Sequence, residues 1–235
     1  MFNRFHLDYY QRIAENFHYI LKELNINDCK TILEVLSWWS PKLWIALYSL
    51  GYTWDFYVID KNKYFLNELK EGLKIFSPKF QLHLLKIDIF SISNFGNFDM
   101  VIGNHIIDDL IFQYYCDLNL IKIENIYDNW ELFIQIWKKI SIDYDLIENI
   151  VNILERIFIW SVGKNWYLIL TQYLGHIEKN FDIDSYNISK LVIEKLIKKL
   201  TLIWFKENFE INEKVYLNLN YYYFKKEDLY ILKRN

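Results

Sequence analysis

Residues 31–60 read TILEVLSWWSPKLWIALYSLGYTWDFYVID, and this stretch decides the fold. It begins with a short apolar run of strand type, TILEVL (31–36), which leads into a loop. Residues 42–50 carry apolar side chains at helical spacing and stop at Gly51, a residue type that commonly ends helices. FYVID (56–60) then returns as a strand. The order strand, loop, helix, strand is typical of an α/β protein.

The chain after Asp60 repeats this alternation. A helix is predicted over 63–76, a strand over 81–88 (QLHLLKID) and another strand over 98–104 (FDMVIGN). Alternating strands and helices favour parallel pairing with right-handed crossovers, and nearly continuous apolar strands favour a sheet that is covered on both faces. The fold class is therefore α/β, with a doubly wound and mostly parallel sheet.

Helical segments flank this alternating core. An amphipathic helix that starts at Tyr10 lies in the N-terminal segment 1–29. Long helical patterns fill 110–162, which we expect to form a helical insertion or cap over the sheet. The remainder is read as one continuous domain over 1–235, because no linker composition interrupts it.

The C-terminal part returns to strands. WYLILT (166–171) is predicted as a strand and 188–200 as a helix, and the tail from Leu202 contains the extended segments VYLNL (215–219) and LYILK (229–233). A terminal run of strands without an intervening helix predicts an antiparallel C-terminal strand on an otherwise parallel sheet.

Composition narrows the function classes. A chain that is 53% hydrophobic is not disordered, and a net charge of −3 gives no indication of nucleic-acid binding. Cys29 and Cys116 lack the spacing of a disulfide framework or of a zinc site, so no metal is expected. The start of the chain is charged, and no apolar run reaches the roughly 18 residues of a membrane span. We expect a soluble cytoplasmic protein without membrane association.

Polar residues close each predicted strand. They are the stretch from Glu34 to Ser40, then Asp60, Asp88, and Asn104 with His105. In an open α/β sheet the ligand lies beyond the carboxyl ends of the strands, where the strand order reverses. These residues are therefore the candidates for a binding site.

Four of these stretches follow one another as motifs. ILEVLSWWSPK (32–42), YVIDKN (57–62), LLKIDIF (84–90) and FDMVIGNHIIDDL (98–110) together resemble the ordered motif series of class I S-adenosylmethionine-dependent methyltransferases. The resemblance spans roughly residues 30–110 and continues more weakly through NWYLILTQY (165–173). It implies the Rossmann-like methyltransferase sheet of seven strands.

The resemblance also implies a cofactor, S-adenosylmethionine, and a role for each strand end. Glu34 matches the acid that opens the family's E/D-x-G-x-G-x-G loop, and Asp60 matches the acid that accepts from the ribose hydroxyls. Asp88 matches the acid that accepts from the adenine amino group, and Asn104 would stand beside the methyl donor. The chemistry suits these roles, because an ionised carboxylate only accepts hydrogen bonds. The neighbouring positions that complete the predicted cofactor site are Leu36, Ser37, Trp38, Lys61 and Ile89.

The loop after the first strand departs from the family pattern. Leu36, Trp38 and Ser40 stand at its three glycine positions, and Trp39 lies beside them. Glycine is needed there so that the backbone can turn tightly and approach the cofactor. Two adjacent indoles would fill the space of the methionine and ribose groups.

Glycine is scarce elsewhere and tryptophan abundant, with six glycines against nine tryptophans. Trp54, Trp166 and Trp204 stand where glycine would suit a turn or a strand start. Some bacterial lineages decode UGA as glycine, and a translation with another code would write tryptophan. We therefore consider the hypothesis that some of these tryptophans are glycine in the native protein. Trp137, on an apolar helical stripe, could be a core tryptophan.

Structural explanations compete with the functional ones for several residues. Asp60 and Asp88 could each cap the segment that follows them. Asp108 and Asp109 are expected to be acids of a first helical turn rather than catalytic groups. His83 shows no metal-ligand spacing and is expected to be structural. No catalytic residue is assigned.

Three functions remain at this stage. The first is methyl transfer from S-adenosylmethionine to an unknown acceptor beneath the 110–162 cap, by a monomer or homodimer. The second is a catalytically inactive binding or scaffold module whose pocket is blocked by Trp38 and Trp39. The third is a nicotinamide-binding Rossmann domain, which is disfavoured because no G-x-G-x-x-G follows the first strand.

Overall fold

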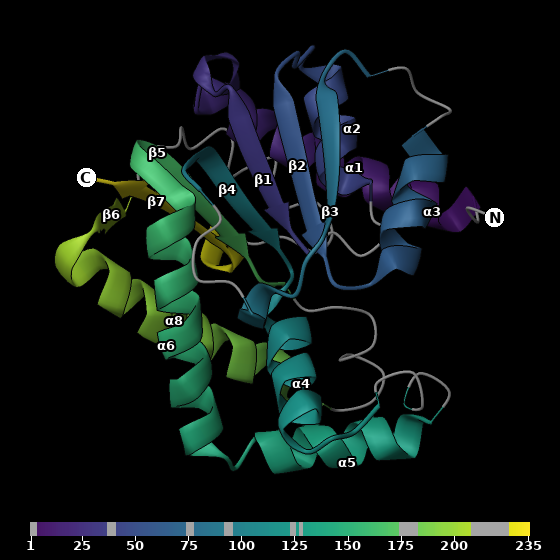
Figure 1. The fold of residues 1–235 in the computed structure, drawn as a ribbon, viewed down its shortest axis with the longest axis vertical. Coiled ribbons are helices and arrows are strands. Elements are labelled where there is room, and N and C mark those ends of the chain that lie inside the picture. Colours follow the sequence, from purple (N-terminus) through teal and green to yellow (C-terminus); the bar gives the residue numbers. More distant parts are fainter. Residues whose placement is uncertain are drawn as a thin grey trace.

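The computed structural model describes residues 4–36, 41–73, 78–91, 96–122, 126, 129–173, 183–207 and 226–235. In this part of the chain seven strands form one sheet, in the order β3-β2-β1-β4-β5-β7-β6 (Figure 1). The first five strands run parallel, and β7 lies antiparallel between β5 and β6. The predicted mixed sheet of seven strands with an antiparallel C-terminal strand is confirmed.

The strands run close to their predicted bounds, and the carboxyl ends of the parallel strands β1 to β5 meet at one edge of the sheet (Figure 1). Two strands differ from the prediction. β3 ends at Lys86, two residues before Asp88. β5 starts four residues earlier than predicted, because the polar residues Lys164 and Asn165 interrupt its apolar pattern. The strands are β1 Thr31–Val35, β2 Asp55–Asp60, β3 Gln81–Lys86, β4 Phe98–Asn104, β5 Val162–Thr171, β6 Phe205–Glu207 and β7 Leu229–Arg234.

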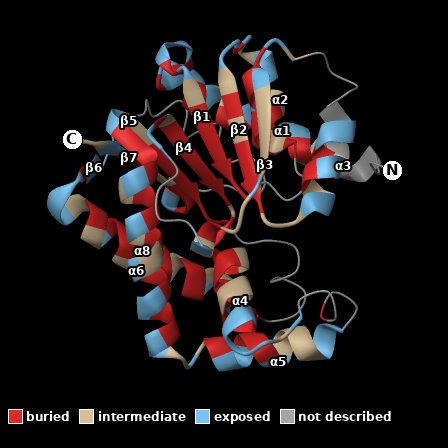
Figure 2. Cartoon of the chain, viewed as in Figure 1, coloured by how far each residue is buried: buried red, intermediate tan, exposed pale blue. Residues whose placement is uncertain are grey.

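One face of the sheet is covered by α1 (Arg4–Glu23), α2 (Lys42–Ser49) and α3 (Lys63–Leu73). Alternate strand residues such as Ile32 and Phe56 point into this layer, where they meet the apolar side of α1. The central strands β1, β2 and β4 are buried over most of their length, whereas the edge strand β3 is only partly buried (Figure 2). This continuous burial explains why the strands read as nearly unbroken apolar runs.

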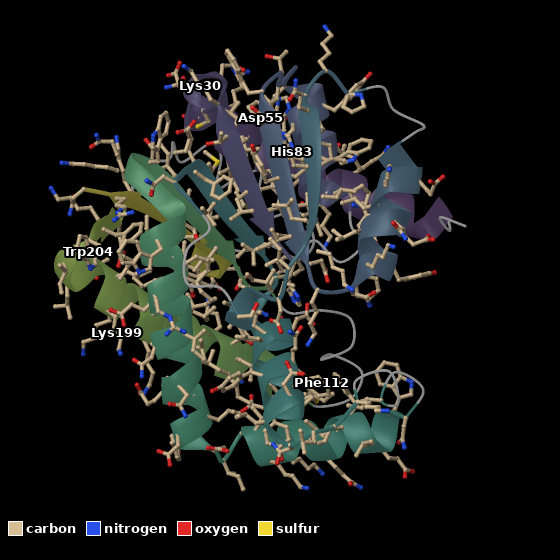
Figure 3. All side chains as sticks on the ribbon, viewed as in Figure 1. Lys30, Asp55, His83, Phe112, Lys199 and Trp204 are labelled. Carbon is tan, nitrogen blue, oxygen red and sulfur yellow. The ribbon has the colours of Figure 1, made fainter. Side chains whose placement is uncertain are left out.

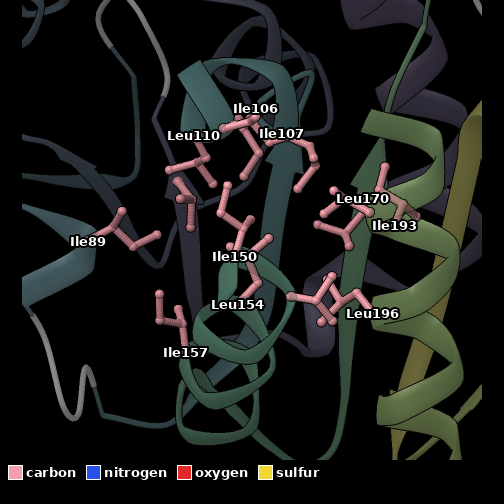
Figure 4. Packing of buried hydrophobic residues seen from close by; sticks show 14 of the residues in the cluster. Ile89, Ile106, Ile107, Leu110, Ile150, Leu154, Ile157, Leu170, Ile193 and Leu196 are labelled. Atoms are coloured by element: carbon pink, nitrogen blue, oxygen red, sulfur yellow. The ribbon is translucent and has the colours of Figure 1, made fainter. Parts of the chain in front are cut away.

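The opposite face is covered by α6 (Tyr144–Ser161) and α8 (Ser185–Ile203). Leu154 of α6 and Leu196 of α8 are fully buried and belong to one cluster with Leu170 of β5 (Figure 4). The outer sides of the two helices are linked by Lys195 with Glu148.

Two further helices extend beyond the carboxyl ends of the strands. α4 (Ile107–Leu118) starts directly after β4, and α5 (Trp130–Ile140) crosses its far end (Figure 1). Helices α4 to α6 thus occupy the range predicted as helical, although α6 also covers the sheet. None of the described helices combines the length and apolar character that crossing a membrane requires.

The segments 37–40, 174–182 and 208–225 lie outside the described residues. The predicted extended segment 215–219 falls in the last of them, whereas 229–233 lies in β7, as expected. The prediction for α8 was too short by three residues at each end, because Ser185 and Thr201 extend the helix beyond its apolar stripe.

Candidate functional site

The candidate site lies at the carboxyl ends of β1 and β4, where the strand order reverses. β1 continues toward β2 and β3, whereas β4 continues toward β5, so these two strands border the switch point of the sheet. Glu34 is in register with Val58 and Ile102, whose side chains lie in the layer of α1 and α2. Since side chains alternate along a strand, Asp60 and Asn104 point to this same face. The topology therefore brings three predicted site residues to one edge and one face.

Glu34 is a buried acid in an apolar strand. It is 3% exposed, and burial raises its pKa to about 8, while the charge of Lys42 acts in the opposite direction. A carboxyl group in this state can be neutral at pH 7 and become charged when a cationic ligand arrives. A buried acid of this kind suits a role in binding, whereas a surface acid would be exposed to solvent.

Lys42 occupies the first turn of α2 and reaches across the site. Its Nζ donates to Tyr173 Oη at 3.0 Å and lies 5.7 Å from the ring centroids of both Tyr10 and Tyr173. It thereby links α1, α2 and the chain after β5. Lys42 was not predicted as a site residue, because its partners are far away in the sequence.

Leu36 ends β1 in a left-handed turn. It has φ +52°, in the left-handed region that glycine adopts without strain, and its N–H donates to Ile59 O at 2.9 Å. The predicted site residues Ser37 and Trp38, together with Trp39 and Ser40, lie outside the described residues. The conformation at Leu36 fits the tight turn that the motif requires.

Asp60 and Asp88 both cap the backbone that follows them. Asp60 is 3% exposed and its Oδ1 accepts from the N–H of Asn62 at 2.8 Å, and Asp88 Oδ1 accepts from the N–H of Phe90 at 3.0 Å. The N–H of Ile87 donates to Asp60 O at 3.1 Å, which brings the ends of β2 and β3 together. The capping explanation is thus realised for both acids. Because each carboxylate has a second oxygen, capping is compatible with ligand binding.

The two neighbours of these acids point elsewhere. Lys61 Nζ forms an ion pair with Asp117 Oδ2 at 3.1 Å, which ties the end of β2 to α4. The side chain of Ile89 is buried in the core cluster beneath α4. The side chains of Lys61 and Ile89 thus contact α4 and the core cluster. Their predicted contact with the cofactor remains a prediction.

Asn104 closes β4 and is held by β5. Thr171 Oγ1 donates to Asn104 Oδ1 at 2.9 Å, and the N–H of His105 donates to Thr171 O at 2.9 Å. His105 has φ +54°, a strained conformation for a non-glycine residue. Its Nε2 donates to Tyr173 O at 2.7 Å, and its Nδ1 lies 3.5 Å from Asp108 Oδ2. These contacts clamp the turn between β4 and α4.

Asp108 and Asp109 lie in the first turn of α4, as expected. Asp108 is nevertheless buried, with its side chain against His105. A buried polar side chain on an amphipathic helix gives no periodic signal that distinguishes it from a surface acid, so the sequence did not reveal this.

His83 and Asp55 form a pair toward the amino ends of β3 and β2, away from the candidate site. His83 Nε2 lies 2.6 Å from Asp55 Oδ1, and the His83 ring stacks on Tyr57 at 4.3 Å between centroids. Figure 3 shows Asp55 and His83 at the end of the sheet that is remote from Phe112 of α4. His83 therefore has a structural environment away from the candidate site, as expected.

The described tryptophans do not require glycine. None of Trp54, Trp166 and Trp204 is among the described residues with positive φ, so the backbone imposes no need for glycine at these positions. Trp137 is buried in the core below α4, as its helical stripe predicted. The hypothesis that some tryptophans are glycine therefore stays a prediction. Its main ground is the sequence at residues 38 and 39.

Comparisons of sequence find no relative: no family model matches the chain, and no curated protein matches it. Comparisons of structure find solved proteins with a similar fold. A complex of the plantazolicin methyltransferase BpumL with a monoazolic desmethylPZN analog and SAH superposes with a TM-score of 0.55 at 11% identity, covering 96% of this chain and 84% of that chain.

Two further solved structures agree. A putative O-methyltransferase from Nostoc punctiforme has a TM-score of 0.53 at 9% identity and covers 95% of this chain and 56% of that chain. The apo form of the S-adenosylmethionine-dependent methyltransferase SibL has a TM-score of 0.52 at 9% identity, covering 92% and 53% respectively. At such identities the likeness concerns the fold, and it agrees with the strand order found above. The chain has the Rossmann-like fold of the class I S-adenosylmethionine-dependent methyltransferases.

Proposed function

We propose that the protein is a cytoplasmic S-adenosylmethionine-dependent methyltransferase that binds its cofactor across the carboxyl ends of β1, β2 and β3. The observation that carries this proposal is the set of three buried polar residues at the switch point. Glu34, Asp60 and Asn104 come from three strands, and they share one face and one edge of a sheet with the methyltransferase strand order. Buried polar groups that converge in this way suit a ligand with several polar atoms.

The residues present fit the cofactor. Asp60 and Asp88 place carboxylates at the ends of β2 and β3, and carboxylate oxygens are the acceptors that ribose hydroxyls and an adenine amino group require. The left-handed turn at Leu36 lets the backbone leave β1 as a cofactor loop does. When bound, S-adenosylmethionine supplies a methyl group on a positively charged sulfur. Glu34 would stabilise positive charge at this edge once it is ionised.

The chain contributes mainly position to the reaction. α4 and α5 extend beyond the carboxyl ends of the strands, so an acceptor beneath them would face the edge that carries Asn104. Holding the acceptor in line with the methyl group can supply most of the rate enhancement without a dedicated base. The acceptor enters this proposal as an unknown, and a monomer or a homodimer would serve equally.

The second candidate is a catalytically inactive binding module of the same fold. The observation that favours it is the pair of adjacent indoles in the loop, with Trp38 at a glycine position of the motif and Trp39 beside it. Cofactor binding separates the two candidates, since a blocked pocket binds neither S-adenosylmethionine nor its product.

The test begins with the codons for residues 38, 39, 44 and 54 and with peptide masses of the native protein. Binding of S-adenosylmethionine is then measured by calorimetry for the chain as written and for Trp38→Gly/Trp39→Gly. Exposed Trp54 provides the matched control, Trp54→Gly. The proposal expects binding by the double variant and no gain from the control. Absence of binding by the glycine-containing loop would refute it and leave the inactive module.

A further inference from the structure

The end of α8 exposes three consecutive apolar side chains. Leu202 is 74% exposed, Ile203 is 68% exposed and Trp204 is 40% exposed. Ile203 comes one helical turn after the fully buried Leu200, so the apolar stripe of α8 continues past the point where neighbouring elements cover it. Figure 3 shows Trp204 at the outer edge of the molecule. A run of three exposed apolar residues is unfavourable in water and indicates a surface that meets an apolar partner.

Basic side chains lie beside this apolar run. Lys206 of β6 and Lys233 of β7 are both exposed and lie directly opposite each other in the sheet. The N–H of Asn235 donates to Trp204 O at 2.9 Å, and the guanidinium of Arg234 lies 5.6 Å from the centroid of the Trp204 ring. These contacts hold the end of β7 against the end of α8. Apolar and basic side chains thus belong to one surface, which we call the α8–β7 surface.

The fold itself does not need this pair of lysines. Like charges directly opposite each other in a sheet are destabilising. Neither Lys206 nor Lys233 forms an ion pair with another residue in the described part of the chain. Glu207, the next residue of β6, points to the opposite face because side chains alternate along a strand. A chain of net charge −3 therefore concentrates positive charge here, which suits an anionic partner.

The chemistry of the α8–β7 surface distinguishes among anionic partners. Nucleic acids are bound through phosphate contacts and through stacking on aromatic rings, and the aliphatic side chains of Leu202 and Ile203 serve neither. A second copy of the chain in a twofold contact would set the same lysines against each other. An anionic bilayer offers acidic headgroups to the lysines and an apolar boundary to the aliphatic side chains. Leu202 and Ile203 provide this apolar part whether residue 204 is tryptophan or glycine in the native protein.

We propose that the α8–β7 surface docks on an anionic lipid bilayer, with Lys206 and Lys233 at the headgroups and Leu202 and Ile203 inserted among them. This function goes beyond the proposed methyl transfer and does not depend on it. The expectation of no membrane association rested on the charged start of the chain and on the lack of a spanning apolar run. Neither of these concerns a docking surface that forms only in the folded chain.

Docking on this surface leaves the candidate site accessible. β7 runs antiparallel to β5, and Arg234 near the end of β7 donates to Val162 O at the start of β5. The α8–β7 surface therefore lies toward the amino ends of the parallel strands, whereas Asn104 lies at the carboxyl end of β4. A bilayer on this surface would face away from the edge that carries the candidate site.

The probe is a vesicle made of equal parts of phosphatidylglycerol and phosphatidylcholine, with pure phosphatidylcholine vesicles as the neutral reference. Sedimentation of the full chain with the vesicles measures binding at physiological ionic strength. The unchanged protein is expected to bind the anionic vesicles and not the neutral ones. Lys206→Gln/Lys233→Gln should weaken this binding roughly thirtyfold, because two attractions to the anionic surface are lost. Leu202→Ser/Ile203→Ser should weaken it roughly tenfold or more, because less apolar surface is inserted.

Matched controls make the same kinds of change at the other end of the helical layer. Lys138→Gln/Lys139→Gln at the end of α5 and Ile142→Ser in the turn that follows alter exposed residues, and both should bind like the unchanged protein. Thermal unfolding checks that each variant folds. If the double serine variant fails to fold, the double glutamine variant of β6 and β7 decides, because it changes only exposed side chains.

Each outcome decides the inference. Absence of binding to the anionic vesicles, equal binding to the neutral ones, or unchanged binding in a folded variant of the α8–β7 surface overturns it. An equal loss of binding in the control variants overturns it as well. Stronger binding to poly(U) RNA than to the anionic vesicles, or a dimer in light scattering that Leu202→Ser/Ile203→Ser dissociates, would assign the surface to another partner and reject the bilayer.

Discussion

The buried carboxyl group of Glu34 should make the stability of the protein depend strongly on pH. Burial raises its pKa from 4.5 to about 8 in the folded chain, whereas the unfolded chain exposes it to water. Between these two values the folded protein binds more protons than the unfolded one, so the free energy of unfolding falls as the pH rises. The loss is complete above the folded pKa and absent below the unfolded one.

The magnitude follows from the same pKa values. Each pKa unit corresponds to about 1.4 kcal/mol, so the ionised carboxylate costs about 5 kcal/mol of stability at pH 9. No discount for solvent is needed, because Glu34 is only 3% exposed. Glu34→Gln keeps the shape and removes the ionisation. The variant should therefore gain about 4 kcal/mol over the unchanged protein between pH 5 and pH 9, because about 1 kcal/mol of the cost is already present at pH 5.

Urea unfolding at pH 5, 7 and 9 measures this difference on the cofactor-free protein. Glu15→Gln is the control, since it removes an exposed carboxylate from α1 and should change the free energy of unfolding by less than about 0.5 kcal/mol at each pH. Lys42→Met should steepen the loss in the protein that retains Glu34, because the ammonium lowers the pKa of that carboxyl. A separation between Glu34→Gln and the unchanged protein that stays constant from pH 5 to pH 9 would refute the reasoning.

Four other substitutions test the site and the fold. Asp60→Asn keeps an oxygen that can accept from the N–H of Asn62 but loses the charge. In the Trp38→Gly/Trp39→Gly protein, calorimetry should therefore show S-adenosylmethionine affinity reduced roughly tenfold, with little change in thermal midpoint. Leu154→Ala should lower the free energy of unfolding by about 2–5 kcal/mol in urea, because this side chain is fully enclosed between α6 and the sheet, and a smaller loss would contradict that packing. Leu120→Gly should raise the free energy of unfolding by up to about 1 kcal/mol, since Leu120 has φ +53° and is 92% exposed. The control, Leu118→Gly at the end of α4, should lower it. A change of the same sign in both variants would argue against backbone strain at Leu120.

The central strands could be predicted because they are buried on both faces. TILEVL and FYVID are apolar runs closed by turn residues, and their bounds agree with β1 and β2 to within one residue. β5 was predicted from residue 166, yet it begins at Val162. The polar residues Lys164 and Asn165 interrupt its apolar run, and Asn165 has φ +68° beside a register shift against β4. An irregular strand start carries no period that a sequence pattern can reveal.

The site could be predicted only in part. Glu34, Asp60 and Asn104 were accessible to sequence reasoning because each closes a strand, and parallel strands bring their carboxyl ends together. The contact between Lys42 and Tyr173 was not accessible, because it joins residues 131 positions apart through a charge and an aromatic ring. Asp108 was read as a helix acid, and its burial against His105 depends on a turn whose shape only the folded chain defines.

The place of β7 has a consequence for synthesis on the ribosome. β7 lies between β5 and β6, so among the described strands β6 has no neighbour until β7 inserts beside it. The chain is made from its N-terminus, and during that time β5 is an open edge with unpaired backbone groups. Residues 229–234 cover that edge last, and Arg234 then bonds to Val162 O at the start of β5. We expect nascent chains that stop before β7 to be held by chaperones or to associate through β5, and release of the last strand to complete the domain.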